Sequence, residues 1–234
     1  MRLYYHTFIL CLFCFKYKSY ATTAIHSFIP GSDKRLMLTF DDGPDLKWTP
    51  LLLDLLKMKG IKATFFLVGK NASDYPDLVK RMIDEGHEVA NHTWNHVDIT
   101  KLTPEILNEE LSKTNSLIYE ISQYTPKTFR PPYGNTNPRL NDKITKDFSM
   151  RVIKWSIDSL DWRGHTAEHI QKTVTQAVKT GDILLFHEGK QNTMKMLPNF
   201  LDDMISQGYL FVTAIEMLSH LDPSKTRSRS LRGS

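Results

Sequence analysis

The stretch LMLTFDDGP, residues 36–44, joins an apolar run to two adjacent acids and a Gly-Pro pair. Leu36–Phe40 has the length of a buried strand, and Gly43-Pro44 is typical of the turn that follows one. Six other apolar runs also predict strands: Ala63–Val68, Glu88–Ala90, Thr128–Phe129, Arg151–Trp155, Ile183–Phe186 and Leu210–Val212. The quoted stretch is therefore the first of seven predicted strands, and polar residues follow it directly.

Amphipathic segments that predict helices alternate with these strands: Pro50–Lys59, Pro76–Glu85, Pro104–Ser122, Asn137–Phe148, Thr166–Lys179 and Met194–Gln207. Thr103-Pro104-Glu105 is typical of a helix start, because threonine caps the first N–H groups and proline fits the first helical position. Alternating strands and helices predict parallel β-α units. We expect an α/β fold of one domain, a complete or incomplete (β/α)7–8 barrel, with an open doubly wound sheet as the alternative.

The composition of the 234 residues, 41% hydrophobic and 24% charged, is that of an ordinary globular protein and argues against disorder, collagen and coiled coil. The net charge of +4 comes from the two ends, because residues 1–21 and 224–234 carry seven bases and no acid. The rest of the chain has 23 bases against 26 acids, so we expect no nucleic-acid partner. The glycine motifs of nucleotide-binding loops do not occur either.

The N-terminal segment is expected to be a signal peptide or a membrane anchor. Leu3–Phe15 is an apolar run behind Arg2, short for a bilayer span but long enough for a signal-peptide core. Cys11 and Cys14 lie in this segment, so its removal would leave no thiol for catalysis. We predict an extracytoplasmic protein, secreted or associated with the cell wall or membrane. Its predicted parts are a leader or anchor over residues 1–24, a catalytic domain over 25–223 and a basic flexible tail over 224–234.

Polar clusters follow several of the predicted strands. In a β/α barrel the loops after the strands gather at one face, where such folds place their active sites. After the first strand, Asp41 and Asp42 could form a simple turn, or could point to opposite sides, one toward a metal and one toward a reacting water. After the third strand, His92 and His96 would face the same way on a helical turn and could bind one metal, although a chance pair is plausible.

Two His and one strand-end Asp would leave open positions for water and substrate, as hydrolytic metal sites require. Arg130 could be a surface residue on a proline turn, or could orient a catalytic carboxylate and hold it ionised. His187 could be a satisfied core residue, or could protonate a leaving amine while a nearby aspartate such as Asp161 raises its pKa.

Five motifs together resemble the polysaccharide deacetylase family, carbohydrate esterase family 4, which shares the nodulation-deacetylase homology domain. They occur in the order of that family: Thr39–Pro44, His92–His96, Arg130–Gly134, Asp158–Trp162 and Leu185–His187. Each motif alone is weak, whereas their joint occurrence is specific. The resemblance implies a distorted (β/α) barrel, which agrees with the alternation of strands and helices.

The resemblance also implies roles for individual residues. Asp42, His92 and His96 would hold one divalent metal, usually zinc, with cobalt or nickel able to substitute. Asp41 would be the general base that deprotonates the attacking water, and Arg130 would orient Asp41.

The remaining implied roles concern the leaving group and the substrate. His187 would be the general acid toward the departing amine, and Asp161 would tune it. Four residues would bind the substrate: Pro131, Tyr133, Trp162 and Leu185. Among these, Tyr133 would stabilise the oxyanion through its backbone N–H, whereas Trp162 and Leu185 would line the pocket for the acetyl methyl.

Amide hydrolysis needs these residue types, because an amide is a poor electrophile and its amine leaves only when protonated. We expect a polysaccharide N-deacetylase that removes N-acetyl groups from N-acetylglucosamine residues, with peptidoglycan favoured as substrate by the export signal. Alternatives are a chitin oligosaccharide deacetylase and an acetylxylan esterase. A non-catalytic glycan-binding wall protein is the contrasting class, and the presence of both Asp41 and His187 argues against it. We expect the protein to be a monomer.

Overall fold

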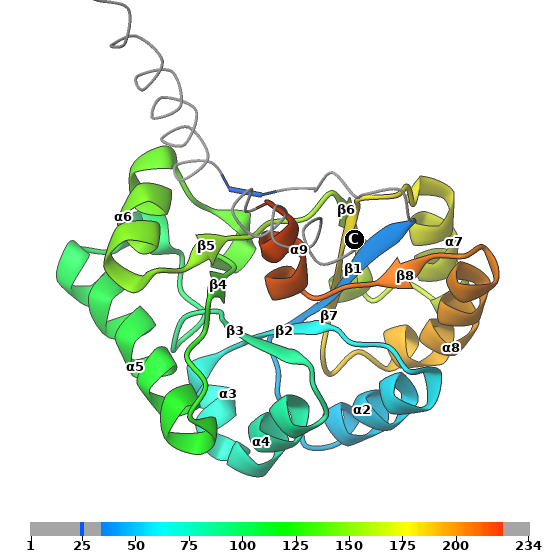
Figure 1. The fold of residues 1–234 in the computed structure, drawn as a ribbon, viewed down its shortest axis with the longest axis horizontal. Coiled ribbons are helices and arrows are strands. Elements are labelled where there is room, and N and C mark those ends of the chain that lie inside the picture. Colours follow the sequence, from blue (N-terminus) through cyan, green and yellow to red (C-terminus); the bar gives the residue numbers. More distant parts are fainter. Residues whose placement is uncertain (1–23, 26–33, 222–234) are drawn as a thin grey trace, which may run out of the picture.

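The computed structural model describes residues 24–25 and 34–221. Its centre is a curved sheet whose strands pair in parallel (Figure 1). The strands are β1 (Arg35–Asp41), β2 (Thr64–Leu67), β3 (Glu88–Asn91), β4 (Thr128–Phe129), β5 (Arg151–Val152), β6 (Ile157–Asp158), β7 (Ile183–His187) and β8 (Leu210–Phe211). Most of the predicted leader and the whole predicted tail lie outside the described residues.

The strand order is β5-β4-β3-β2-β1-β7-β6, and β8 pairs with the start of β1. Strands therefore follow one another around the sheet from β1 to β5 and from β6 through β7 back to β1. The two ends of this order, β5 and β6, are neighbours in the sequence. This is the order of a barrel with one unpaired junction, so the predicted distorted single-domain barrel is confirmed. The doubly wound alternative is wrong, because its strand order would reverse at a switch point.

Helices surround the sheet (Figure 1). They are α2 (Trp48–Lys59), α3 (Gly69–Asp74), α4 (Pro76–Asp84), α5 (Pro104–Ser122), α6 (Pro138–Phe148), α7 (Ala167–Ala177), α8 (Gln191–Ser206) and α9 (Ala214–Leu221). The predicted start of α5 is confirmed, since Thr103 Oγ1 accepts a hydrogen bond from the N–H of Ile106 at 3.4 Å. The short helices α3 and α9 were not predicted.

One predicted strand extends three residues too far along the chain. The expected strand Arg151–Trp155 ends at Val152, and a separate strand, β6, begins at Ile157. The carbonyl groups of Ile153 and Lys154 instead accept hydrogen bonds from the Arg130 side chain, at 3.4 and 2.8 Å. The Arg130 side chain therefore binds two carbonyls just beyond β5, where Ile25 also pairs with Ile153 in an isolated parallel bridge.

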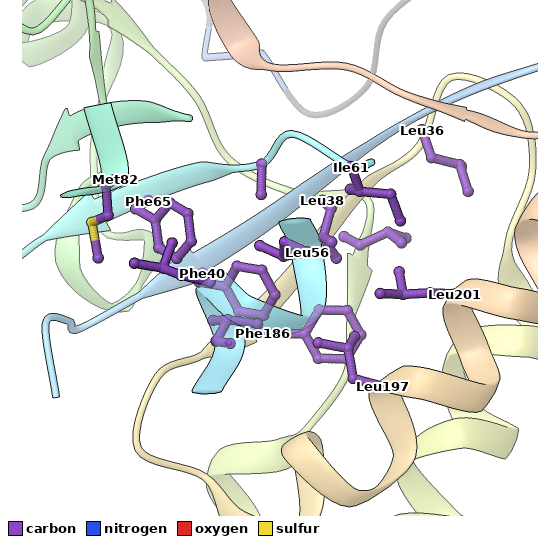
Figure 2. Close-up of a cluster of buried hydrophobic side chains, with 14 of the residues drawn as sticks. Leu36, Leu38, Phe40, Leu56, Ile61, Phe65, Met82, Phe186, Leu197 and Leu201 are labelled. Carbon is purple, nitrogen blue, oxygen red and sulfur yellow. The ribbon is translucent and has the colours of Figure 1, made fainter. Parts of the chain in front are cut away.

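Strand β1 divides its side chains between two apolar clusters. Leu36, Leu38 and Phe40 are buried against residues of α2 and α8, as Figure 2 shows for Leu56 and Leu197. Burying each such side chain contributes about 1.5–3 kcal/mol relative to leaving it exposed. This cluster fastens the helices to the outer face of the sheet.

The alternate residues of β1 point to the other face of the sheet. Met37 belongs there to a second cluster with Phe66, Ile183 and two residues of α9, Ala214 and Met217. Because β8 pairs with the start of β1, α9 covers the amino end of the strands. The inward positions near the carboxyl end are thus left for polar residues.

Within the described ranges, none of the helices combines the length and the apolar character needed to cross a membrane.

Candidate active site

The last residue of β1 and the residue after it point in different directions. Asp41 ends the strand and is 3% exposed, and its Oδ1 lies 2.6 Å from Arg130 Nη1. Asp42 has a left-handed backbone, with φ of 74°. This reversal takes its carboxylate away from Arg130 and toward two histidines. The two adjacent carboxylates therefore have different neighbours, Arg130 for Asp41 and the two histidines for Asp42.

Asp42, His92 and His96 form a compact set of possible metal ligands. Asp42 Oδ1 lies 3.3 Å from His96 Nε2 and 3.6 Å from His92 Nε2, and the three ligand atoms all lie within 4.8 Å of one another. The buried Asp42 Oδ1 has no hydrogen-bond partner among the described residues. An unpartnered buried carboxylate oxygen facing two imidazole nitrogens fits a divalent cation of the zinc type.

The tautomer of His92 also suits metal binding. His92 Nδ1 is 2.6 Å from the carbonyl oxygen of Arg130, so Nδ1 carries the hydrogen and donates it. Burial lowers the pKa of His92 to about 3, which keeps the ring neutral at physiological pH. The lone pair of Nε2 is then available in the direction of Asp42.

The two histidines do not lie on a helical turn, contrary to the prediction from their spacing. The segment after β3 is a loop in which Thr93 and His96 have φ values of 65° and 55°. The rings of His92 and His96 nevertheless approach, with centroids 5.0 Å apart. Tyr133 packs edge-on against His96 at 4.8 Å. The loop, rather than helical periodicity, brings the two ligands together.

Arg130 is fully buried, and its guanidinium is held on several sides. Nη1 donates to Asp41 and to Thr39 Oγ1, at 2.6 and 2.7 Å, and the group lies 4.1 Å over the ring of Phe66. Burial raises the pKa of Asp41 above its ordinary value, although the charge of Arg130 opposes this shift. The surface-residue alternative for Arg130 is therefore wrong.

His187 ends β7, and Asp161 holds it by two contacts. Asp161 Oδ1 is 2.6 Å from His187 Nδ1, and Oδ2 accepts from the backbone N–H of His187 at 2.9 Å. Thr193 Oγ1 also donates to Oδ2, at 2.7 Å. Burial lowers the pKa of His187, but the hydrogen bond and charge of Asp161 raise it more, and the net direction is upward. His187 Nε2 is left to face the site.

A cavity of about 450 Å³ brings these groups together. Its lining includes nine of the predicted site residues: Asp41, Asp42, His92, His96, Pro131, Tyr133, Trp162, Leu185 and His187. Arg130 and Asp161 are not part of the lining; they hold Asp41 and His187 by hydrogen bonds. All eleven predicted residues are thus gathered at the carboxyl ends of the strands.

Comparison with known proteins agrees with this arrangement. A family model described as polysaccharide deacetylase matches residues 29–153, more than half of the chain. The chain belongs to the polysaccharide deacetylase family. Its first strand and the loop that carries both histidines lie in the matched part, whereas His187 lies beyond it.

Two relatives in this family are named peptidoglycan N-acetylglucosamine deacetylases. The chain is 38% identical to the peptidoglycan N-acetylglucosamine deacetylase PgdA of Listeria monocytogenes, over 80% of this chain and 39% of that protein. It is 36% identical to a peptidoglycan N-acetylglucosamine deacetylase of Bacillus cereus, over 82% of this chain and 92% of the relative. The chain therefore spans about two fifths of the Listeria protein.

A solved structure of the family has the same fold. The crystal structure of the Bc1960 peptidoglycan N-acetylglucosamine deacetylase matches with a TM-score of 0.80 and 34% identity, covering 86% of this chain and 94% of that one.

Two further residues line the cavity, Trp155 and Asp158. Asp158 ends β6 and Trp155 lies just before that strand. Their place beside a strand end is the signal that could have found them, but β6 has only two residues. The expected strand Arg151–Trp155 ran almost to its start, so β6 was not predicted as a separate strand.

Unusual backbone conformations also gather at this site. Apart from glycine, the described residues with left-handed φ include Asp42, Thr93, His96, Tyr133 and Leu160. All five belong to the loops that carry the motifs of the family. Such conformations cost about 1–3 kcal/mol each and persist where the surrounding structure enforces them.

Proposed function

We propose that this chain is a metal-dependent N-deacetylase that removes acetyl groups from N-acetylglucosamine residues of peptidoglycan. The observation that carries the proposal is the meeting of three parts in one cavity: a metal-ligand set, a carboxylate outside that set, and a histidine with a raised pKa. The names of the Listeria and Bacillus relatives support the reaction and the polymer.

Asp42, His92 and His96 would hold one divalent ion, which we propose to be zinc. When bound, such an ion supplies Lewis acidity that lowers the pKa of a coordinated water and polarises a carbonyl. Asp42 Oδ1 and the two Nε2 atoms are the donors that this set presents. Cobalt or nickel could take the same place, because the donor set is compatible with each of them.

Asp41 is the proposed general base. Its Oδ1 is occupied by Arg130, so Oδ2 remains to take the proton of the attacking water. Oδ2 lies 3.7 Å from His92 Nε2 and therefore beside the ligand set. The Arg130 bond fixes the carboxylate in this direction, so base and water start in a reactive arrangement.

Charge then develops on the carbonyl oxygen of the substrate. The backbone N–H of Tyr133, in the wall of the cavity, is the proposed donor to this oxyanion. Tyr133 has a left-handed backbone with φ of 60°, which sets the direction of its peptide groups. A fixed donor of this kind needs no reorganisation as the charge appears.

His187 is the proposed general acid. Its Nδ1 is engaged by Asp161, so the proton for the leaving amine is the one on Nε2. The raised pKa keeps this proton available near neutral pH, and Asp161 stabilises the charged ring until the transfer occurs. The amine leaves as the C–N bond breaks and Nε2 gives up its proton.

The mouth of the cavity supplies surfaces for a sugar. Tyr133 is 65% exposed, so its ring is available to stack on a glycan. Leu185, which is buried, and Trp162 would line the pocket for the acetyl methyl, and Pro131 also belongs to the wall of the cavity. We also propose that residues 25–223 form the catalytic domain, and that the protein acts outside the cytoplasm as a monomer, secreted or attached through its N-terminal segment.

The decisive experiment measures acetate release from peptidoglycan, chitopentaose and acetylxylan side by side. The proposal expects the highest kcat/KM on peptidoglycan. Preference for chitopentaose would replace the substrate but keep the N-deacetylation, whereas preference for acetylxylan would make the chain an O-acetyl esterase. Binding to peptidoglycan with no acetate release from any substrate would make the chain a glycan-binding protein instead.

A further inference from the structure

Loop 92–96, which carries both proposed histidine ligands, has no regular secondary structure of its own. Its backbone polar groups are nevertheless bound by fixed neighbours. The carbonyls of Thr93 and Trp94 accept from the N–H groups of Gly69 and Lys70 in α3, at 2.9 and 3.0 Å. The N–H of Thr93 donates to Asn91 Oδ1 at 2.8 Å. These bonds hold the side of the loop that faces α3.

On the side of α5, the side chain of Glu110 binds the backbone of the loop, and Lys113 lies 3.9 Å over the ring of Trp94. Glu110 Oε2 accepts from the backbone N–H groups of Trp94 and Asn95, at 2.8 and 2.9 Å. Its Oε1 accepts from Asn95 Nδ2 at 2.6 Å. Glu110 is 7% exposed, so water does not compete freely for these bonds. Three donors converge on one buried carboxylate.

The residues that Glu110 binds lie between the two ligands in sequence. Thr93 and His96, on either side of Trp94 and Asn95, both have left-handed φ values. A loop with two such residues needs strong external constraints to keep one conformation. A carboxylate suits this task, because it is an acceptor only and can take two backbone N–H groups on one oxygen.

We infer that Glu110 is a positioning residue for the metal site, which acts by fixing the loop that carries His92 and His96. This inference rests on the proposed function, since it assumes that the two histidines bind a metal. Glu110 itself contacts neither the substrate nor the ion. Its substitution should weaken metal binding while leaving Asp41 and His187 in place.

The test is a Co²⁺ titration of the chelator-stripped full-length chain by calorimetry. We expect Glu110→Ala to raise the Kd for Co²⁺ about ten- to a hundredfold, as loss of a partner behind a metal ligand does. Glu110→Gln should fall between wild type and Glu110→Ala. Its amide oxygen can still accept both backbone N–H groups, but its amide nitrogen cannot accept from Asn95.

Glu109→Ala is the matched control, because Glu109 precedes Glu110 on the same helix and is exposed. It should leave the Kd unchanged. Thermal melting of the metal-free variants checks the fold, and Glu110→Gln keeps the test valid where Glu110→Ala does not fold. At saturating Co²⁺ the kcat of Glu110→Gln should return close to the wild-type value.

Two negative results can be told apart. A wild-type Kd in folded Glu110→Ala, or in Glu110→Gln where the alanine variant does not fold, would overturn this inference alone. Failure of the wild-type chain to bind Co²⁺ would overturn the proposed metal site and this inference with it.

Discussion

Asp41 and His187 are register partners at the carboxyl ends of the neighbouring parallel strands β1 and β7. The N–H of the next residue, Glu188, donates to the carbonyl of Asp41 at 2.9 Å. Adjacent strands lie about 4.8 Å apart, so the backbone ladder sets the spacing between the proposed base and the proposed acid. The two groups differ in their partners, because Arg130 holds Asp41 whereas Asp161 holds His187.

The base can be tested separately from the metal. Asp41→Asn should lower kcat at least about a hundredfold, the usual contribution of a general base. The amide oxygen can still accept from Arg130, so the fold should persist and the metal content should stay near that of wild type. Acetate release and elemental analysis measure the two effects. In the parallel variant Asp42→Asn, the metal itself should be lost. Loss of metal from Asp41→Asn alone would mean that the roles of the two aspartates are reversed.

Chelation should abolish acetate release, and added Zn²⁺ or Co²⁺ should restore it. The reason is that Asp42, His92 and His96 without a bound ion supply no Lewis acid to polarise the substrate carbonyl. The measurement is activity before and after EDTA, with the metal content determined on the same samples. Full turnover in a verified metal-free sample would remove the metal from the mechanism.

The pH dependence should report the partner of His187. A general acid works only while protonated, so activity should fall as the pH rises through the pKa of His187. Asp161 raises that pKa by its hydrogen bond and charge. Asp161→Asn should therefore lower the pKa and move the alkaline limb of the profile of kcat/KM to lower pH. A limb that stays in place at equal metal content would show that another group controls it.

Substitutions at Gly43 and Glu188 should have non-additive effects on the free energy of unfolding. A Cβ on Gly43 would overlap the carboxyl group of Glu188, which is buried and bonded to Thr49. Burial also raises the pKa of Glu188 to about 8. Gly43→Ala should lower the free energy of unfolding by about 1–3 kcal/mol, the usual cost of overpacking.

The double variant Gly43→Ala, Glu188→Ala is the control for this contact. Because it removes the overlapping carboxyl, its loss of stability in urea denaturation should be smaller than the sum of the two single losses. Simple additivity would show that Gly43 is needed for a reason other than the space taken by Glu188.

Much of the fold could be predicted because β1 and its neighbours are long, apolar and bounded by turn residues. The two-residue strand β4 was predicted with its correct bounds, whereas the equally short β6 was missed. Arg151–Trp155 reads as one strand because the sequence does not show that Arg130 binds the carbonyls of Ile153 and Lys154.

The candidate site was predicted from the resemblance of its motifs, while its local geometry was predicted less well. The spacing of His92 and His96 suggested a helical turn, because left-handed φ at Thr93 cannot be read from a residue that rarely adopts it. Glu110 gave no signal at all, since an acid on an amphipathic helix usually faces water. The groups that it binds belong to a loop 14 to 18 residues earlier in the chain.

The place of Arg130 between β1 and the segment that follows β5 has a consequence for how this protein could evolve. The guanidinium joins β1 to the carbonyls of Ile153 and Lys154, so one side chain both stabilises the barrel and orients Asp41. In a descendant without catalytic activity, His187 could be substituted at little structural cost, whereas Arg130 could not easily be substituted. Retention of this arginine is therefore a poor marker of activity in such lineages, and its loss would first destabilise the barrel.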